Sequence, residues 1–216
     1  MDEIFKDRTD AAKRLAEKLL WLKNENPVIL AIPRGGVIIG NAISSILNCK
    51  LDVIVSRKVG APDNRELAIG AVMHDGSYFP NIEITGMLNI PESFVEEEIT
   101  KQRREIERRL IKFRGSKEYD LAGKTVVLVD DGIATGVTVS VAAHWIKKQK
   151  PKKLIIAIPV GPPKSIDKLN QIADIVVLQS PYIFNAVSEF YEVFDQVSDD
   201  EVQEIMKKYG YKLKSI

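Results

Sequence analysis

Residues 126–138 read V-V-L-V-D-D-G-I-A-T-G-V-T, and the predicted fold is built outward from them. Four branched apolar residues come first, which is typical of a strand buried on both faces of a sheet. Asp130 and Asp131 follow where that strand should end. Gly132 and Gly136 then bracket a tight turn, after which a helical pattern begins. The stretch therefore predicts a strand, a carboxylate pair, a short loop and a helix start in direct succession.

The loop and the carboxylates suit different chemical groups. A helix N-terminus carries free N–H groups and about half a positive charge, so residues 132–138 suit a phosphate. The carboxylates would repel that phosphate and must face either vicinal hydroxyls or a metal. Ribose 5-phosphate satisfies both halves. A simpler interpretation makes Asp131 a helix cap and Gly132 a turn residue. A cap accounts for one aspartate, but not for both together with the glycines and threonines.

On these residues, the stretch resembles the motif with which type I phosphoribosyltransferases bind 5-phosphoribosyl 1-diphosphate (PRPP). The resemblance implies that Asp130 and Asp131 hold the ribose hydroxyls and serve catalysis. It also implies that one continuous loop binds the 5-phosphate: Gly132, Ile133, Ala134, Thr135, Gly136, Val137 and Thr138.

Other sites with an aspartate at a strand end fit less well. A receiver domain places its acidic pair after the first strand, whereas here the pair comes late. The P-loop pattern G-x-x-x-x-G-K-[ST] and the Rossmann pattern G-x-G-x-x-G are both absent from the sequence.

Composition narrows the function classes. The chain has 216 residues, 45% of them hydrophobic, which is enough for one domain with its own core. A net charge of +1 favours no nucleic-acid partner, and no apolar run is long enough for a membrane span. The charged first ten residues are unlike a signal peptide. A single cysteine, Cys49, suits a reducing cytoplasm, where we expect the protein.

Apolar runs at 28–32, 52–56, 126–129, 153–158 and 174–178 predict strands, with helical patterns between most of them. This order predicts an α/β fold with a doubly wound, mainly parallel five-stranded sheet. We expect a single domain over residues 1–216. Its core would span about 28–179, with a mobile hood loop at about 60–90 and a C-terminal hood segment at about 180–216. Sites in such sheets form at the carboxyl ends of the strands.

Basic residues follow two of the predicted strands. Arg34, Gly35 and Gly36 come after the first strand, where the resemblance implies the loop that binds pyrophosphate. Arg57 and Lys58 come after the second strand, where orotate-type enzymes carry a similar pair, so we assign them to pyrophosphate as well. An ordinary strand-to-helix turn and a solvated pair of cations remain the alternatives.

Residues 60–89 form the least regular region, with a hairpin signal at His74-Asp75-Gly76. In the resembling family a segment here closes over the substrates, and Glu66 at its base is a candidate catalytic group. A strong helical pattern covers residues 91–112. Arginines gather toward its end, and we expect them to form a solvated face: Arg103, Arg104, Arg108, Arg109 and Arg114. A contact with a partner or with pyrophosphate is the alternative.

The aromatic segment after the last strand resembles the one that stacks on the base in purine phosphoribosyltransferases. By that resemblance Tyr182 and Phe184 would bind the base, and Glu189 would help to hold magnesium. Packing in the core is the alternative role of these aromatics.

The resemblance implies an enzyme that uses PRPP and Mg²⁺, the metal being held mainly by PRPP. It would transfer the phosphoribosyl group to a nitrogen nucleophile, such as a nucleobase, and release pyrophosphate. Ala134 stands where hypoxanthine-guanine enzymes place an aspartate, which disfavours 6-oxopurines as acceptors. Homodimers are common in this family. The alternative is a regulator on the same fold that binds PRPP or a nucleotide without turnover.

Overall fold

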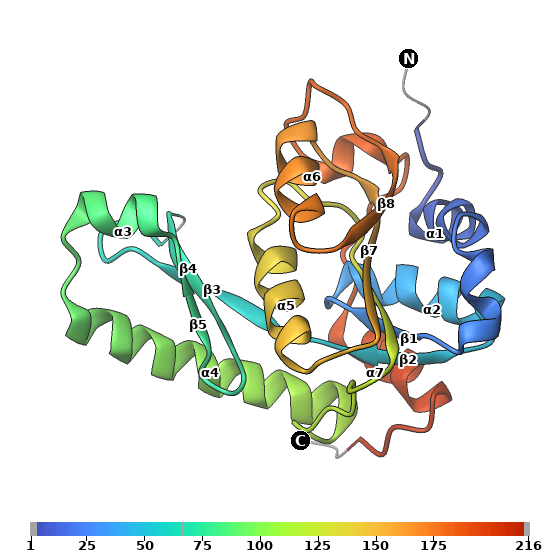
Figure 1. The fold of residues 1–216 in the computed structure, drawn as a ribbon, viewed down its shortest axis with the longest axis horizontal. Helices are drawn as coiled ribbons and strands as arrows, with labels where there is room; N and C mark the ends of the chain where they lie inside the picture. The colour runs from blue at the N-terminus through green and yellow to red at the C-terminus, as the bar shows by residue number, and fades with distance from the viewer. Residues whose placement is uncertain (1–3, 66, 214–216) are drawn as a thin grey trace.

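A computed structural model of the protein describes residues 4–65 and 67–213. Its centre is a five-stranded parallel sheet with the strand order β2-β1-β6-β7-β8 (Figure 1). The strands are β1 (Val28–Ala31), β2 (Lys50–Val53), β6 (Thr125–Val129), β7 (Lys153–Val160) and β8 (Asp174–Gln179). Every residue of β1 and β6 is buried, as expected for strands covered on both faces. The predicted α/β class and the five-stranded parallel sheet are confirmed.

Helices cover both faces of this sheet. Val127 and Val129 of β6 pack with α1 (Arg8–Glu17), α2 (Gly35–Leu47) and α7 (Asp199–Lys208). Val126 and Leu128 point to the other face and pack with α5 (Val137–Lys148) and α6 (Pro163–Asn170). A 3₁₀ turn, η1 (Leu20–Glu25), follows α1. Among the described residues, no helix combines the length and the apolar character needed to cross a bilayer.

A second unit projects from the sheet, and we call it the hood arm (Figure 1). It contains an antiparallel sheet of β3 (Ser56–Gly60), β4 (Ala68–Met73) and β5 (Tyr78–Pro80), followed by α3 (Ile82–Leu88) and α4 (Glu92–Arg114). The predicted hairpin is present, because β4 and β5 pair on either side of the His74–Asp75 turn.

The predicted second strand, 52–56, is wrong in its extent. β2 ends at Val53, and the chain leaves the parallel sheet to begin β3 at Ser56. Backbone groups of β3 then pair with β4, with Ser56 opposite Met73 and Arg57 opposite Val72. Arg57 and Lys58 therefore lie inside a strand of the hood arm, and not in a loop beyond a strand of the parallel sheet.

Arg114 is also not part of a solvated face. Its guanidinium makes a two-pronged ion pair with Asp52 of β2, with both N–O distances 2.8 Å. The two side chains are only 5% and 4% exposed. Arg114 Nη1 also donates to the carbonyl oxygens of Ser116 and Glu118, and the guanidinium lies over the Tyr119 ring. This pair fastens the end of α4 to the edge of the parallel sheet.

Arg114→Met is expected to lower the free energy of unfolding by about 3–5 kcal/mol, because it leaves the Asp52 carboxylate buried without its counter-charge. Urea denaturation measures the loss. Arg108→Gln is the matched control, because the ion pair of Arg108 with Glu105 is largely exposed and should contribute at most about 1 kcal/mol. Equal losses for the two variants would contradict a special contribution from the buried pair.

Candidate functional site

Asp130 and Asp131 lie directly after β6, at the carboxyl edge of the parallel sheet. Both residues are half-buried, and the Asp131 N–H donates to Asp130 Oδ1 at 2.9 Å. Burial, and then the negative charge of Asp131, raise the pKa of Asp130 well above its usual range. Two adjacent carboxylates at a partly dry position need an opposing charge or hydrogen-bond donors.

The loop after β1 packs against this pair. A Cβ atom built on Gly35 would lie 1.8 Å from Asp131 Oδ2, and one on Gly36 would lie 3.0 Å from Asp130 Cα. Glycine is therefore the residue that lets the start of α2 approach the carboxylates so closely. The structure thus brings together the two predicted motifs, which are about a hundred positions apart in the sequence.

The predicted phosphate loop has an anchored base and an open tip. Gly132 is buried, and a Cβ there would lie 2.5 Å from Val187 Cγ1. Ile133 is buried too, and its N–H donates to the carbonyl oxygen of Val160. Ala134, Thr135 and Thr138 are exposed. The exposed hydroxyls and the α5 N-terminus are the parts of this loop that a phosphate could reach.

Two further features shape the loop. Gly136 has a φ of +71°, in the left-handed region that favours glycine, and it precedes Val137 at the start of α5. Ser165 of α6 donates its hydroxyl to the Ala134 carbonyl oxygen at 2.7 Å. Sequence reasoning missed Ser165, because nothing in its local pattern indicates a contact 31 positions away.

A cavity of about 550 Å³ lies between the hood arm and the phosphate loop. Thr135 and Gly136 of the loop line one side, and Phe79 of β5 lines another. His144 of α5 and Lys168 of α6 add polar groups. The cavity shows that the hood arm stands close enough to the phosphate loop to contribute to a binding site.

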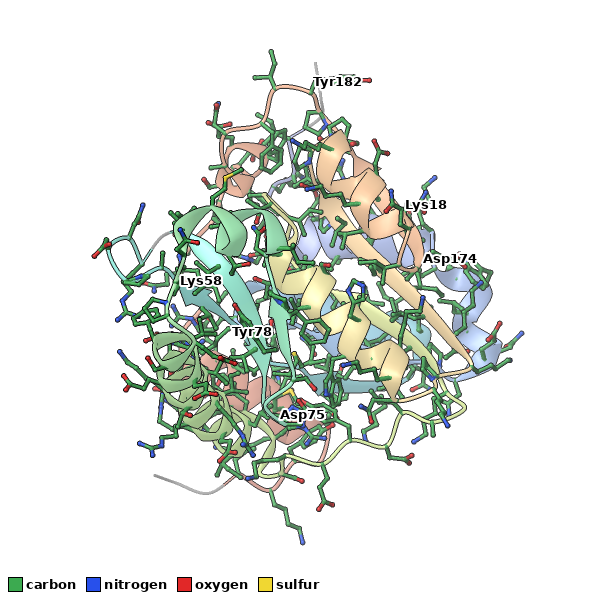
Figure 2. The ribbon with its side chains drawn as sticks, turned by 60° about the vertical axis from the view of Figure 1, so that its left-hand side comes forward. Lys18, Lys58, Asp75, Tyr78, Asp174 and Tyr182 are labelled. Atoms are coloured by element: carbon green, nitrogen blue, oxygen red, sulfur yellow. The ribbon has the colours of Figure 1, made fainter. Side chains whose placement is uncertain are left out.

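The predicted pyrophosphate cations lie toward α4 and α7. Arg34 Nη1 is 3.7 Å from Asp199 Oδ1 at the start of α7, and Arg57 Nε donates to Gln102 of α4. Glu105 faces Arg57 at 4.0 Å. Hydrogen bonding from Arg108 is the main cause that lowers the pKa of Glu105 to about 2. The side chain of Lys58 is exposed on the hood arm (Figure 2).

The predicted base-binding and metal residues lie after β8. Tyr182 is 93% exposed and projects from the tip of its loop (Figure 2). Phe184 stacks on Phe190 with a ring-centroid separation of 5.1 Å. Glu189, in the 3₁₀ turn η2 (Val187–Phe190), accepts hydrogen bonds from Asn185. Glu66, the predicted catalytic residue of the hood loop, lies outside the described residues.

Arg8 is a site residue that the sequence did not reveal. Its Nε donates to Asp131 Oδ2 at 2.7 Å, although the two residues are 123 positions apart. Tyr191 also contacts Asp131, because its hydroxyl donates to the Asp131 carbonyl oxygen at 2.5 Å. Neither contact has a local sequence signal, since both depend on how the chain ends pack around the sheet.

Magnesium fits this site in one particular way. Among the described residues, no three His, Cys, Asp or Glu side chains gather in a way that could hold a metal ion. Mg²⁺ commonly uses one or two carboxylates together with substrate phosphates, so it needs no such protein cage. The residues present therefore fit a metal that is carried mainly by a diphosphate ligand.

The family model for the phosphoribosyl transferase domain matches residues 1–194. A Mycobacterium tuberculosis protein, named on prediction as a phosphoribosyl transferase and found in two strains, is 37% identical over 202 residues, or 93% of this chain. The match covers 46% of that protein, so the chain spans about half the length of the curated relatives it matches.

Solved structures agree in fold. The protein TT1426 from Thermus thermophilus is 35% identical with a TM-score of 0.82, and the match covers 95% of this chain and 99% of that one. A purine phosphoribosyltransferase from Pyrococcus horikoshii shares the fold at 22% identity and a TM-score of 0.51, over 92% of this chain and 99% of that one. With the family model covering most of its length, this chain belongs to the phosphoribosyl transferase domain family.

Proposed function

We propose that the protein is a phosphoribosyltransferase that uses PRPP and Mg²⁺. It would transfer the 5-phosphoribosyl group to a nitrogen nucleophile and release pyrophosphate. A nucleobase is the first acceptor to test. The observation that carries this proposal is the meeting of two motifs at one edge of the sheet. The Gly35–Gly36 turn lies against the Asp130–Asp131 pair, and the phosphate loop follows directly.

Each part has a physical task. The carboxylates of Asp130 and Asp131 accept hydrogen bonds from the ribose hydroxyls and stabilise positive charge that develops on the sugar ring as the leaving group departs. Residues 132–138 bind the 5-phosphate through the exposed hydroxyls of Thr135 and Thr138 and the α5 N-terminus. This grip lies away from the reacting carbon, so its binding energy can be used to orient the sugar.

The pyrophosphate is assigned to Arg34, Gly35, Gly36, Arg57 and Lys58. Arg34 and Arg57 would exchange their contacts with Asp199 and Glu105 for contacts with the leaving group. Mg²⁺ neutralises charge on the diphosphate when it is bound, with Glu189 as the proposed protein ligand. The protein's own contribution is to place cations on the departing side of the sugar.

The acceptor is assigned to the hood. Tyr182 and Phe184 are the proposed base-binding residues, and Glu66 is the proposed group that handles the acceptor proton. We further propose that the segments at about 60–90 and 180–216 close over the substrates as parts of one domain, which would protect PRPP from hydrolysis. A homodimer and a cytoplasmic location remain predictions.

The test is an assay with labelled PRPP, MgCl₂ and a panel of nucleobases that includes adenine, hypoxanthine, guanine, uracil and orotate. Pyrophosphate release that depends on one of the bases is the expected result, with the 6-oxopurines among the poorest acceptors because of Ala134. Tight PRPP binding without pyrophosphate release for any amine or base would favour the regulator. Absence of PRPP binding would remove both.

A further inference from the structure

Arg8, the first residue of α1, is held on three sides next to the aspartate pair. Its Nε donates to Asp131 Oδ2 at 2.7 Å, and its Nη1 donates to the Asp195 carbonyl oxygen at 2.8 Å. The guanidinium carbon lies 3.8 Å from the centroid of the Phe194 ring. The Arg8 side chain is 11% exposed and that of Asp131 is 15% exposed. Such a guanidinium has one orientation, and its ionic partner is a proposed substrate-binding carboxylate.

The backbone around Arg8 is fixed as well. Residues 5–6 are joined to residues 190–193 by backbone hydrogen bonds of 2.8–3.0 Å. Tyr191, in the middle of this second segment, donates its hydroxyl to the Asp131 carbonyl oxygen. Asp131 is therefore held from two segments of the chain. Arg8 contacts its carboxylate, and Tyr191 contacts its backbone carbonyl.

We propose that Arg8 is a positioning residue that fixes Asp131 for the ribose hydroxyls of the substrate. This inference rests on the proposed function. The guanidinium occupies Oδ2 of Asp131, and the Asp131 N–H occupies Oδ1 of Asp130. Asp131 Oδ1 and Asp130 Oδ2 are then the oxygens assigned to the substrate. A ligand with a vicinal diol then meets acceptors whose orientation is already set, so it loses less binding free energy to ordering.

Electrostatics supports the same role. The two adjacent carboxylates repel each other, and among the described residues Arg8 is the cation within salt-bridge distance of the pair. The Arg8 charge offsets part of this repulsion, and it acts on the pKa of Asp130 in the lowering direction, against the larger raising effects of burial and of Asp131. The opposite possibility is that Arg8 blocks the diol site, in which case removing it would strengthen binding.

The experiment measures the dissociation constants of two probes by calorimetry in the full chain. PRPP with Mg²⁺ carries the diol, and magnesium pyrophosphate lacks it. Arg8→Gln is expected to weaken PRPP binding about 10- to 100-fold, because it removes one charge-assisted contact from the pair. Pyrophosphate affinity should stay within about twofold of that of the unmodified protein. Arg8→Lys keeps the charge but lacks the planar guanidinium, so it should bind PRPP less weakly than Arg8→Gln does.

Arg14→Gln is the matched control, since it removes a guanidinium from the same helix whose salt bridge goes to Asp10. It should leave both dissociation constants unchanged. Unchanged or tighter PRPP binding by Arg8→Gln would overturn the positioning role. So would an equal loss for pyrophosphate, which would mean a general loss of structure. Failure of the unmodified protein to bind PRPP would overturn the proposed function itself, and this inference with it.

Discussion

Replacing Asp130 and Asp131 together by asparagine is expected to abolish measurable PRPP binding. A carboxylate offers only acceptors to a diol, whereas an amide replaces one acceptor oxygen by a donor group. Hydrogen bonds to charged groups contribute about 1.5–3 kcal/mol each, so the loss of two such partners should weaken binding at least about 100-fold. Calorimetry with PRPP and Mg²⁺ measures the change.

The same double variant distinguishes specific binding of the diol from general charge attraction, because charge attraction alone predicts tighter PRPP binding. Removing negative charge beside an anionic ligand should strengthen a non-specific attraction. Unchanged or tighter PRPP binding would therefore eliminate the diol assignment. The asparagine at 131 keeps a carbonyl oxygen that can accept from Arg8, so urea denaturation should show a folded protein.

Asp174→Asn is the control for this experiment. Asp174 lies at the first residue of β8, which is the opposite end of the sheet from the proposed site, and it is labelled in Figure 2. Its exposed carboxylate pairs with Lys153 at 3.1 Å. The variant removes a charge by the same chemistry, but PRPP affinity should not change.

The parts of the structure that the sequence predicted are those governed by local patterns. The apolar run before Asp130 indicated a buried strand, and the alternation of strands with helices indicated a parallel sheet. Because parallel strands end at one edge, the loop at Gly35 and the loop at Asp130 had to lie on the same side. Their direct contact, in which a Cβ on Gly35 would clash with Asp131, is finer than that reasoning could reach.

The parts that were missed or wrong depend on contacts between distant segments. Ser56 and Arg57 continue the extended chain after β2, and only pairing with β4 shows that they belong to another sheet. Arg114 sits among exposed arginines in the sequence, yet its partner Asp52 is 62 positions away and buried. Arg8 likewise contacts Asp131, which lies 123 positions further along the chain. None of these pairings leaves a periodicity in the sequence.

Gly35→Ala is expected to weaken PRPP binding, because the added methyl group would displace the Asp131 side chain. The new methyl group would lie 1.8 Å from Asp131 Oδ2, 2.5 Å from its Cγ and 2.9 Å from Arg8 Nε. Asp131 must then turn away and lose Arg8. We expect the PRPP dissociation constant to rise about 10- to 100-fold, because a misoriented Asp131 loses a charge-assisted hydrogen bond to the ribose hydroxyls. Overpacking should also lower the free energy of unfolding by about 1–3 kcal/mol.

Gly86→Ala provides the matched control, because a Cβ at Gly86 of α3 would meet no described residue within 4 Å outside its own stretch of helix. Alanine favours a helix over glycine by about 1 kcal/mol, so this variant should be as stable as the unmodified protein or slightly more so. Its PRPP affinity should be unchanged.

Combining Gly35→Ala with Arg8→Gln tests whether the two substitutions weaken PRPP binding through the same contact. If the methyl group acts by breaking the contact between Arg8 and Asp131, the double variant should bind PRPP about as weakly as the weaker of the two single variants. A fully multiplicative loss would contradict the shared cause, because it would mean that Gly35 and Arg8 contribute to binding independently.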